Sequence, residues 1–114
     1  MDRGVFANKI FQPGELIETT PVIVISMAEW RIMKKTVLNN YAFSFEEDSQ
    51  EMAIALGFGS LYNHSYNPNA SYFKRIKEKV IDFYAIRLIK GGEEITINYN
   101  GDPNSTDLLW FNRD

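Results

Sequence analysis

Apolar and polar side chains alternate along much of this chain, and an alternation of that period is typical of a β-strand. The clearest case is the segment 79–88, in which Ile81, Phe83 and Ala85 share one face and alternate with the residues of the other face. Shorter stretches with strand character recur before and after it, at residues 4–7, 41–45, 52–58 and 94–99. The pattern therefore predicts a chain built mostly from short strands.

The segment from Leu16 to Ser26 is rich in β-branched residues but contains Pro21, which cannot donate a backbone hydrogen bond. It predicts two short strands, or one bent strand at the edge of a sheet. Only residues 28–35 favour a helix, with Trp30 and Met33 on one side. Turn-forming residues separate the strands at 12–15, 46–51, 63–69 and 90–93. We expect a mostly β fold with little helix, and a small barrel, a sandwich and an irregular fold all remain open.

Composition narrows the class of protein without indicating a function. A length of 114 residues suits one domain, and 45% hydrophobic with 24% charged residues is typical of a globular chain. The chain has no cysteine, which excludes disulfides and thiolate metal sites. Its single histidine, His64, argues against a histidine-based metal site, so no metal is expected.

Charge and hydropathy exclude further classes. The net charge is −3 and the basic residues form no long run, so direct binding to nucleic acid is not expected, whereas a basic peptide would suit the surface better. No apolar run reaches the length that crosses a membrane, and the first residues lack the apolar stretch of a secretion signal. The chain opens almost directly into a strand-like segment, which leaves open whether residues precede it.

Three segments are too polar or too unusual to be plain core. Residues 61–69 place three asparagines and His64 between apolar stretches, which is either a surface loop with Asx turns or a ligand-holding loop of fixed shape. Residues 92–99 resemble a hairpin strand ending in Tyr99, which could simply be a rim aromatic. Residues 3–7 contain a glycine that either marks a turn or lets a ligand approach the backbone. None of the three is decisive alone.

Taken in order, the three segments resemble the signatures of the SET domain family of protein lysine methyltransferases. Asn63-His64-Ser65 followed by Asn67-Pro68-Asn69 is similar to the family's Asn-His-Ser-x-x-Pro-Asn. Gly92-Glu93-Glu94-Ile95 leading to Tyr99 is similar to Gly-x-Glu-Leu-x-x-x-Tyr, and Arg3-Gly4-Val5-Phe6-Ala7 to Gly-x-Gly-Val-Phe-Ala. The likeness spans nearly the whole chain and is greatest to the minimal SET proteins of viruses and bacteria.

The resemblance implies one SET domain over residues 1–114, with the family's β-clip-like fold of several small curved sheets. In that fold the late segment passes under the Asn-His loop in a pseudoknot-like C-terminal crossing, which would bring Asn63, His64 and Tyr99 together. The chain departs from the family at Asp2, in place of a glycine, and lacks the zinc-binding cysteines that follow many SET cores. The substrate channel must therefore be closed in another way.

The resemblance further implies transfer of a methyl group from S-adenosylmethionine to a lysine amine of a protein, with S-adenosylhomocysteine as the second product. Tyr99 is expected to be the catalytic residue, because its hydroxyl can position the reacting groups while staying protonated. The residues expected to bind the cofactor are Arg3, Gly4, Phe6, Asn63, His64 and Tyr99. The residues expected to line the substrate channel are Tyr41, Tyr72, Trp110 and Phe111.

Several of these assignments have alternatives. Tyr41 could equally be a half-buried strand aromatic, and Trp110 and Phe111 could pack the C-terminal tail onto the core rather than close the channel. By the resemblance, Tyr72 limits how many methyl groups are added, which favours mono-methylation. The acidic run at 46–51 is either a solvated turn or a surface that attracts a basic substrate.

Two other functions are compatible with the motifs. The chain could be a non-catalytic SET-like module that binds S-adenosylmethionine or a lysine-bearing peptide, or a β-rich interaction domain that matches the motifs by chance. As an enzyme, its expected partner is a basic protein that carries lysine, and the small viral relatives suggest a homodimer. The expected location is intracellular, in the cytoplasm or, for a histone substrate, in the nucleus. Neither nucleic acid nor a membrane is an expected partner.

Overall fold

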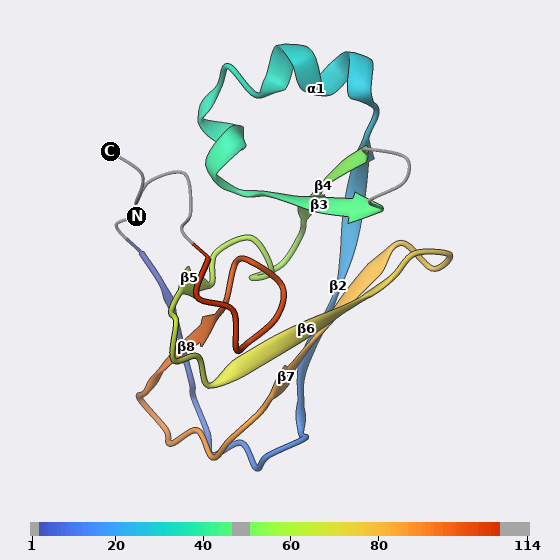
Figure 1. Cartoon of the computed structure of the whole chain (residues 1–114). Coiled ribbons are helices and arrows are strands. Elements are labelled where there is room, and N and C mark those ends of the chain that lie inside the picture. Colours follow the sequence, from blue (N-terminus) through green and yellow to red (C-terminus); the bar gives the residue numbers. More distant parts are fainter. Residues whose placement is uncertain (1–2, 47–50, 108–114) are drawn as a thin grey trace.

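The computed structural model describes residues 3–46 and 51–107, and its strands form two sheets (Figure 1). The larger sheet has five antiparallel strands in the order β3-β4-β2-β7-β6, and the smaller has three in the order β1-β8-β5. The strands are β1 (Val5–Phe6), β2 (Leu16–Ile25), β3 (Ala42–Glu46), β4 (Glu51–Ala55), β5 (Asn63–His64), β6 (Ala70–Arg75), β7 (Val80–Ala85) and β8 (Glu94–Ile97). An α-helix, α1 (Met27–Met33), and a 3-10 helix, η1 (Val37–Asn40), lie between β2 and β3. The predicted mostly β fold with little helix is confirmed.

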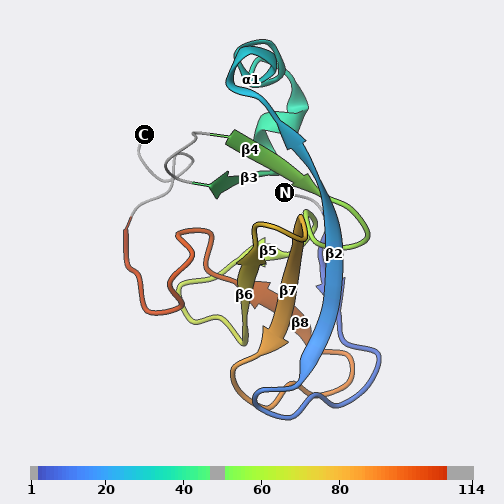
Figure 2. The same ribbon diagram turned by 90° about the vertical axis from the view of Figure 1, so that its right-hand side faces the viewer.

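β2 is a single strand of ten residues, although Pro21 lies in its middle. The part up to Pro21 pairs with β7, and the part from Val22 onward pairs with β4. Pro21 therefore lies where the strand changes partners, which is where a missing backbone N–H is best tolerated. The prediction of two strands is wrong, because β2 is one continuous strand that joins the two halves of the sheet (Figure 2). Each half of β2 pairs with one neighbouring strand.

Other element boundaries also differ from the prediction. The strand predicted at 52–58 ends at Ala55, because the following turn leaves Leu56 and Phe58 exposed. β8 ends at Ile97, so Tyr99 follows the strand instead of belonging to it. The alternation pattern did not reveal β6 or η1.

A capping box fixes the start of α1. The hydroxyl of Ser26 accepts a hydrogen bond of 3.2 Å from the N–H of Glu29, and the carboxylate of Glu29 accepts one from the N–H of Ser26. The helix predicted at 28–35 is observed at Met27–Met33, and its half-buried residues are Trp30 and Met33. In the part of the chain that the structure describes, no helix is long and apolar enough to cross a membrane.

The smaller sheet contains the chain crossing. β8 lies between β1 and β5, and its parallel pairing with β5 places Asn63 opposite Thr96. Asn69, which is 2% exposed, fastens the loop after β5 onto β8 with both ends of its side-chain amide. Its Nδ2 donates to the carbonyl oxygen of Glu94 at 2.8 Å, and its Oδ1 accepts from the N–H of Thr96 at 2.9 Å. The late strand is thus threaded against the Asn-His loop, as the resemblance implied.

The inner faces of the two sheets share one hydrophobic core. Ile81, Phe83 and Ala85 of β7 are fully buried, as their alternation predicted, and Ile95 and Ile97 of β8 join them. Because β8 contributes to this core, the residues directly after it are held at a defined place beside the larger sheet.

Candidate functional site

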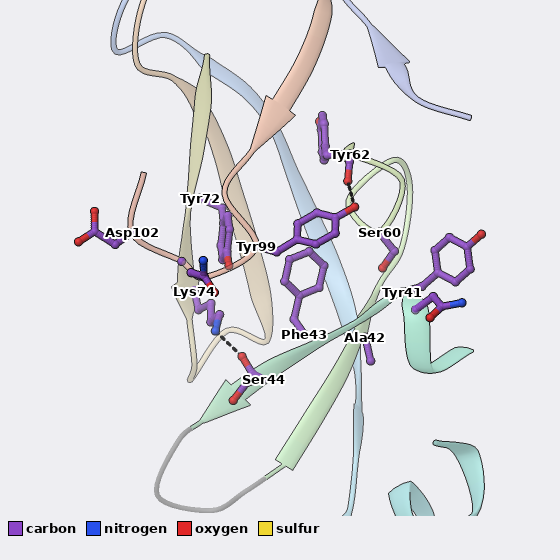
Figure 3. A pocket seen from close by; sticks show the side chains of 13 residues that line it. Tyr41, Ala42, Phe43, Ser44, Ser60, Tyr62, Tyr72, Lys74, Tyr99 and Asp102 are labelled. Atoms are coloured by element: carbon purple, nitrogen blue, oxygen red, sulfur yellow. Dashed lines mark hydrogen bonds between the residues drawn. The ribbon is translucent and has the colours of Figure 1, made fainter. Parts of the chain in front are cut away.

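A cavity of about 530 Å³ lies between β3, β6 and the turn that follows β8 (Figure 3). β3 and β6 are the outer strands of the larger sheet, and the curvature of that sheet brings both to the cavity wall. Much of the wall is formed by aromatic residues, namely Tyr41, Phe43, Tyr62, Tyr72 and Tyr99. The cavity is therefore suited to an extended, largely apolar chain with a polar end.

Tyr99 is held in this wall through both its side chain and its backbone. Its hydroxyl donates a hydrogen bond of 2.6 Å to the backbone carbonyl of Tyr62, and its N–H donates one of 3.0 Å to Nδ1 of His64. The rings of His64 and Tyr99 lie 5.2 Å apart. The crossing thus brings the tyrosine of the last motif to the Asn-His loop, which is the convergence that the resemblance implied.

The phenols of Tyr99 and Tyr72 are protonated near neutral pH. Burial raises the pKa of Tyr99 to about 12, and burial likewise raises the pKa of Tyr72 to about 12. Burial lowers the pKa of His64, which favours the neutral imidazole whose Nδ1 accepts the hydrogen bond from Tyr99. Tyr99 can therefore donate a hydrogen bond but is not a general base at neutral pH.

Asn63 fastens the N-terminal segment to β8. Its Nδ2 donates to the carbonyl oxygen of Arg3 at 2.8 Å and to Oε2 of Glu94 at 2.7 Å. Gly4 lies against this pair, since a Cβ there would be 2.2 Å from Oε2 of Glu94 and 2.9 Å from Nδ2 of Asn63. Phe6, which is 61% exposed, pairs with Glu94 in the sheet. Four of the residues predicted to bind the cofactor, Arg3, Gly4, Phe6 and Asn63, are therefore neighbours.

Tyr72 and Tyr41, two of the residues expected to line the substrate channel, both lie in the wall of this cavity. The ring of Tyr72 packs edge-on against Phe43, with 5.4 Å between ring centroids, and Tyr41 is half-buried. The hydroxyl of Tyr72 would lie 3.6 Å from a Cβ placed on Gly101, so it is close to the turn that follows Tyr99. In Figure 3, Tyr72 and Tyr41 flank Tyr99 from opposite sides.

Three residues discussed from the sequence cannot be placed in the site. The two remaining channel candidates, Trp110 and Phe111, lie outside the described residues, and so does Asp2. Among residues 3–46 and 51–107, no group of three or more histidine, aspartate and glutamate side chains could hold a metal ion.

Tyr62, Phe43 and Lys74 are among the wall residues that the sequence did not predict as part of the site. Tyr62 contributes a backbone carbonyl, and its only signal was its place directly before the Asn-His pair. Phe43 could have been assigned from its alternation with Tyr41. Lys74 lies on the unpredicted β6, and its Nζ donates to the backbone carbonyl of Ser44 on β3.

Comparison with known proteins gives matches that agree with one another. The family model of the SET domain matches residues 2–100. A curated relative from Schizosaccharomyces pombe, the histone-lysine N-methyltransferase specific for H3 lysine-37, is 37% identical over 110 residues. That alignment covers 96% of this chain and 69% of the relative.

Solved structures show the same likeness. A Plasmodium falciparum protein assigned as a histone methyltransferase is 30% identical, with a TM-score of 0.69 and coverage of 87% of this chain and 88% of that one. The Chaetomium thermophilum Polycomb Repressive Complex 2 bound to S-adenosylmethionine contains a chain that is 26% identical, with a TM-score of 0.69. That alignment covers 89% of this chain but 14% of the larger one.

Proposed function

This chain belongs to the SET domain family and is an S-adenosylmethionine-dependent protein-lysine methyltransferase, and from that premise we propose that the cavity beside Tyr99 is its lysine channel. The observation that carries the proposal is the hydrogen bond from the Tyr99 hydroxyl to the Tyr62 carbonyl in an aromatic wall. A lysine side chain needs an apolar passage for its methylene groups and polar atoms at the end where its nitrogen reacts.

The residues of the smaller sheet fit the methyl donor of the family. S-adenosylmethionine supplies a methyl group attached to a positively charged sulfur. Gly4 has no side chain, which leaves the neighbouring Asn63–Glu94 pair in place beside the backbone of the N-terminal segment. Both hydrogens of Asn63 Nδ2 are already donated within the protein, so Asn63 would hold the donor through its other polar atoms. We assign Arg3, Gly4 and Asn63 to the cofactor site on these grounds, and Phe6, His64 and Tyr99 by the resemblance to the family.

The cavity wall prepares the lysine for attack. A free lysine amine has a pKa of about 10.4 and is protonated near neutral pH, and in that form it has no lone pair to react. The rings of Phe43, Tyr72 and Tyr99 exclude water, and this desolvation favours the neutral amine. A strong general base is then unnecessary.

Tyr99 aligns the reacting atoms. Its hydroxyl proton is donated to the Tyr62 carbonyl, and this bond fixes the direction of the hydroxyl at the cavity wall. The Tyr99 hydroxyl and the Tyr62 carbonyl form a polar rim that would hold the lysine amine in position to receive the methyl group. Tyr72, whose hydroxyl lies near Gly101, narrows the same space and favours mono-methylation.

The substrate is a lysine-bearing protein, and we propose a basic protein such as a histone. The relative that is 37% identical bears the name of a methyltransferase for a lysine of histone H3. A histone substrate would place this enzyme in the nucleus. Closure of the channel by Trp110 and Phe111 and formation of a homodimer are further parts of the proposal.

The proposed function is tested by radiolabelled methyl transfer to a panel of basic proteins that includes recombinant histone H3. We expect labelling by the wild-type chain and loss of about 100-fold in kcat for Tyr99→Phe, the scale seen when one positioned hydrogen-bonding group is removed. Tyr84→Phe is the matched control, because Tyr84 lies on β7 away from the cavity wall. Full activity of Tyr99→Phe would disprove the role of Tyr99, and no labelling of any protein with retained cofactor binding would favour a non-catalytic binding module.

A further inference from the structure

A carboxylate on the core-facing side of β2 lies behind the cavity wall. The pairing of β2 with β7 shifts between Leu16, opposite Tyr84, and Glu18, opposite Phe83, so Ile17 is the extra residue of a β-bulge. Phe83 is fully buried, and residues directly opposite in an antiparallel pair point to the same face. The bulge therefore turns the Glu18 side chain toward the core, and bulges commonly re-aim side chains in this way.

Glu18 holds the side chain of Tyr62. Its Oε1 accepts a hydrogen bond of 2.5 Å from the hydroxyl of Tyr62, whose residue is 2% exposed. The ring of Tyr62 also packs against Phe83, with 4.6 Å between ring centroids. Gly57, with a φ of +59°, lies next to the same carboxylate, since a Cβ there would be 3.3 Å from Oε2. Tyr62 is thus fixed at its ring and at its hydroxyl.

The same Tyr62 fixes Tyr99 through its backbone. The carbonyl oxygen of Tyr62 accepts the Tyr99 hydroxyl at 2.6 Å, so the orientation of this carbonyl sets the direction in which the Tyr99 oxygen presents its lone pairs. A reacting geometry is sensitive to displacements well below 1 Å. A change in how the Tyr62 ring is held would therefore alter catalysis through the orientation of this carbonyl.

We propose that Glu18 is a positioning residue for methyl transfer, which acts through the Tyr62 side chain on the hydroxyl of Tyr99. The proposal rests on the role given to Tyr99 under the proposed function. Glu18 itself does not line the cavity. Its contribution is to hold Tyr62, and Tyr62 in turn sets the polar rim around the reacting atoms.

The first test needs no methyl acceptor. In NMR spectra of protein labelled with ¹³C at Cζ of tyrosine, the Tyr99 signal is assigned by its disappearance in Tyr99→Phe. We expect this signal to move in Glu18→Ala and in Tyr62→Phe, and to stay near its wild-type position in the control Glu15→Ala, which alters a carboxylate at the exposed turn before β2. An unmoved Tyr99 signal in folded Glu18→Ala and Tyr62→Phe would overturn the proposal.

The second test is a kinetic cycle with the basic protein that the wild-type chain labels most strongly. Glu18→Ala and Tyr62→Phe are each expected to lower kcat about 10-fold while the KM for that protein stays within about 2-fold, and Glu18→Gln is expected to recover most of the loss because its amide oxygen still accepts the bond. In the Tyr99→Phe background, Tyr62→Phe should have no further effect, since the hydroxyl to be oriented is absent.

The outcomes separate the two proposals. Equal losses from Tyr62→Phe with and without the Tyr99 hydroxyl would show that Tyr62 acts independently of Tyr99 and would overturn the positioning role. Full activity of Tyr99→Phe would instead remove the proposed role of Tyr99, whatever the NMR signal does. If Glu18→Ala does not fold, Tyr62→Phe still decides the question, because it keeps the buried ring and removes only the hydroxyl that Glu18 binds.

Discussion

The backbone N–H of Tyr99 donates to Nδ1 of His64, so this imidazole must be unprotonated at that nitrogen for the bond to exist. The rings of Tyr66 and Tyr99 face the imidazole at 4.3 and 5.2 Å, and burial lowers the pKa of His64. Protonation of His64 would place a charged imidazolium in a partly buried site and would break the hydrogen bond from the N–H of Tyr99.

The stability of the protein should therefore depend on pH through His64. Its pKa in the folded state lies below the ordinary value of about 6.5, so the unfolded chain binds the proton first as pH falls. The stabilisation is complete above about pH 6.5 and is lost as pH falls through the lowered folded-state pKa, with a slope of at most about 1.4 kcal/mol per pH unit. Denaturant unfolding between pH 5.5 and 7.5 measures this slope. His64→Asn should flatten it, because His64 is the single histidine of the chain, and an unchanged slope would contradict the assignment.

Gly4→Ala should weaken cofactor binding. The new methyl group would meet Oε2 of Glu94 at 2.2 Å and push it away from Asn63, which disturbs the segment assigned to the methyl donor. We expect the Kd for S-adenosylhomocysteine to rise about 10-fold, equivalent to about 1.4 kcal/mol, in calorimetric titration. Gly91→Ala is the matched control, because a Cβ at Gly91 meets nothing within 4 Å. Equal affinity of the Gly4→Ala and Gly91→Ala proteins would place the cofactor elsewhere.

Tyr72→Phe should change the number of methyl groups added. The substitution keeps the ring that packs on Phe43 and removes the hydroxyl near Gly101, which gives a mono-methylated amine more room. Mass spectrometry of the product should show mono-methylation by the wild-type chain and a rise of about 10-fold in the rate of the second transfer in the variant. Trimethylated product from the wild-type chain would eliminate this role of Tyr72.

Asn69→Ala should destabilise the crossing. Asn69 is buried and makes two hydrogen bonds to the backbone of β8, and its loss leaves the N–H of Thr96 and the carbonyl of Glu94 without these partners. A buried group deprived of its partner costs about 1–3 kcal/mol, so the free energy of unfolding should fall by about 2–4 kcal/mol. Asn39→Ala, on the exposed η1, serves as the control for the loss of an asparagine side chain. A difference between the two variants smaller than about 0.5 kcal/mol in urea unfolding would contradict the role of Asn69.

Local sequence patterns predicted those features that depend on the residues of one strand alone. The alternation at Ile81, Phe83 and Ala85 gave the buried face of β7, and the turn residues marked the ends of several strands. β6 was not predicted, because its cavity-facing side carries Tyr72 and Lys74 instead of aliphatic residues and the strand therefore lacks a clear apolar period. Pro21 misled the strand prediction, because the exchange of partners along β2 depends on strands that lie far away in the sequence.

Only some residues of the candidate site could be predicted from the sequence, for a similar reason. Tyr99, Asn63 and His64 could be singled out because the resemblance assigns roles to their side chains. Tyr62 acts on Tyr99 through a carbonyl that every residue has, so no side-chain pattern could reveal it. From the sequence, Glu18 is an ordinary polar residue of a strand. Only the bulge at Ile17 directs its side chain inward.

The position of β8 between β1 and β5 has a consequence for biosynthesis. During translation β1 and β5 are made before β8, which lies between them in the sheet. Pairs between strands that are distant in the sequence form only after both partners have left the ribosome. Tyr99 follows β8 directly, so it meets His64 and Tyr62 only at the end of this insertion. With the role proposed for Tyr99, a nascent or truncated chain that lacks β8 would not transfer methyl groups, and activity would begin only after translation has passed the crossing.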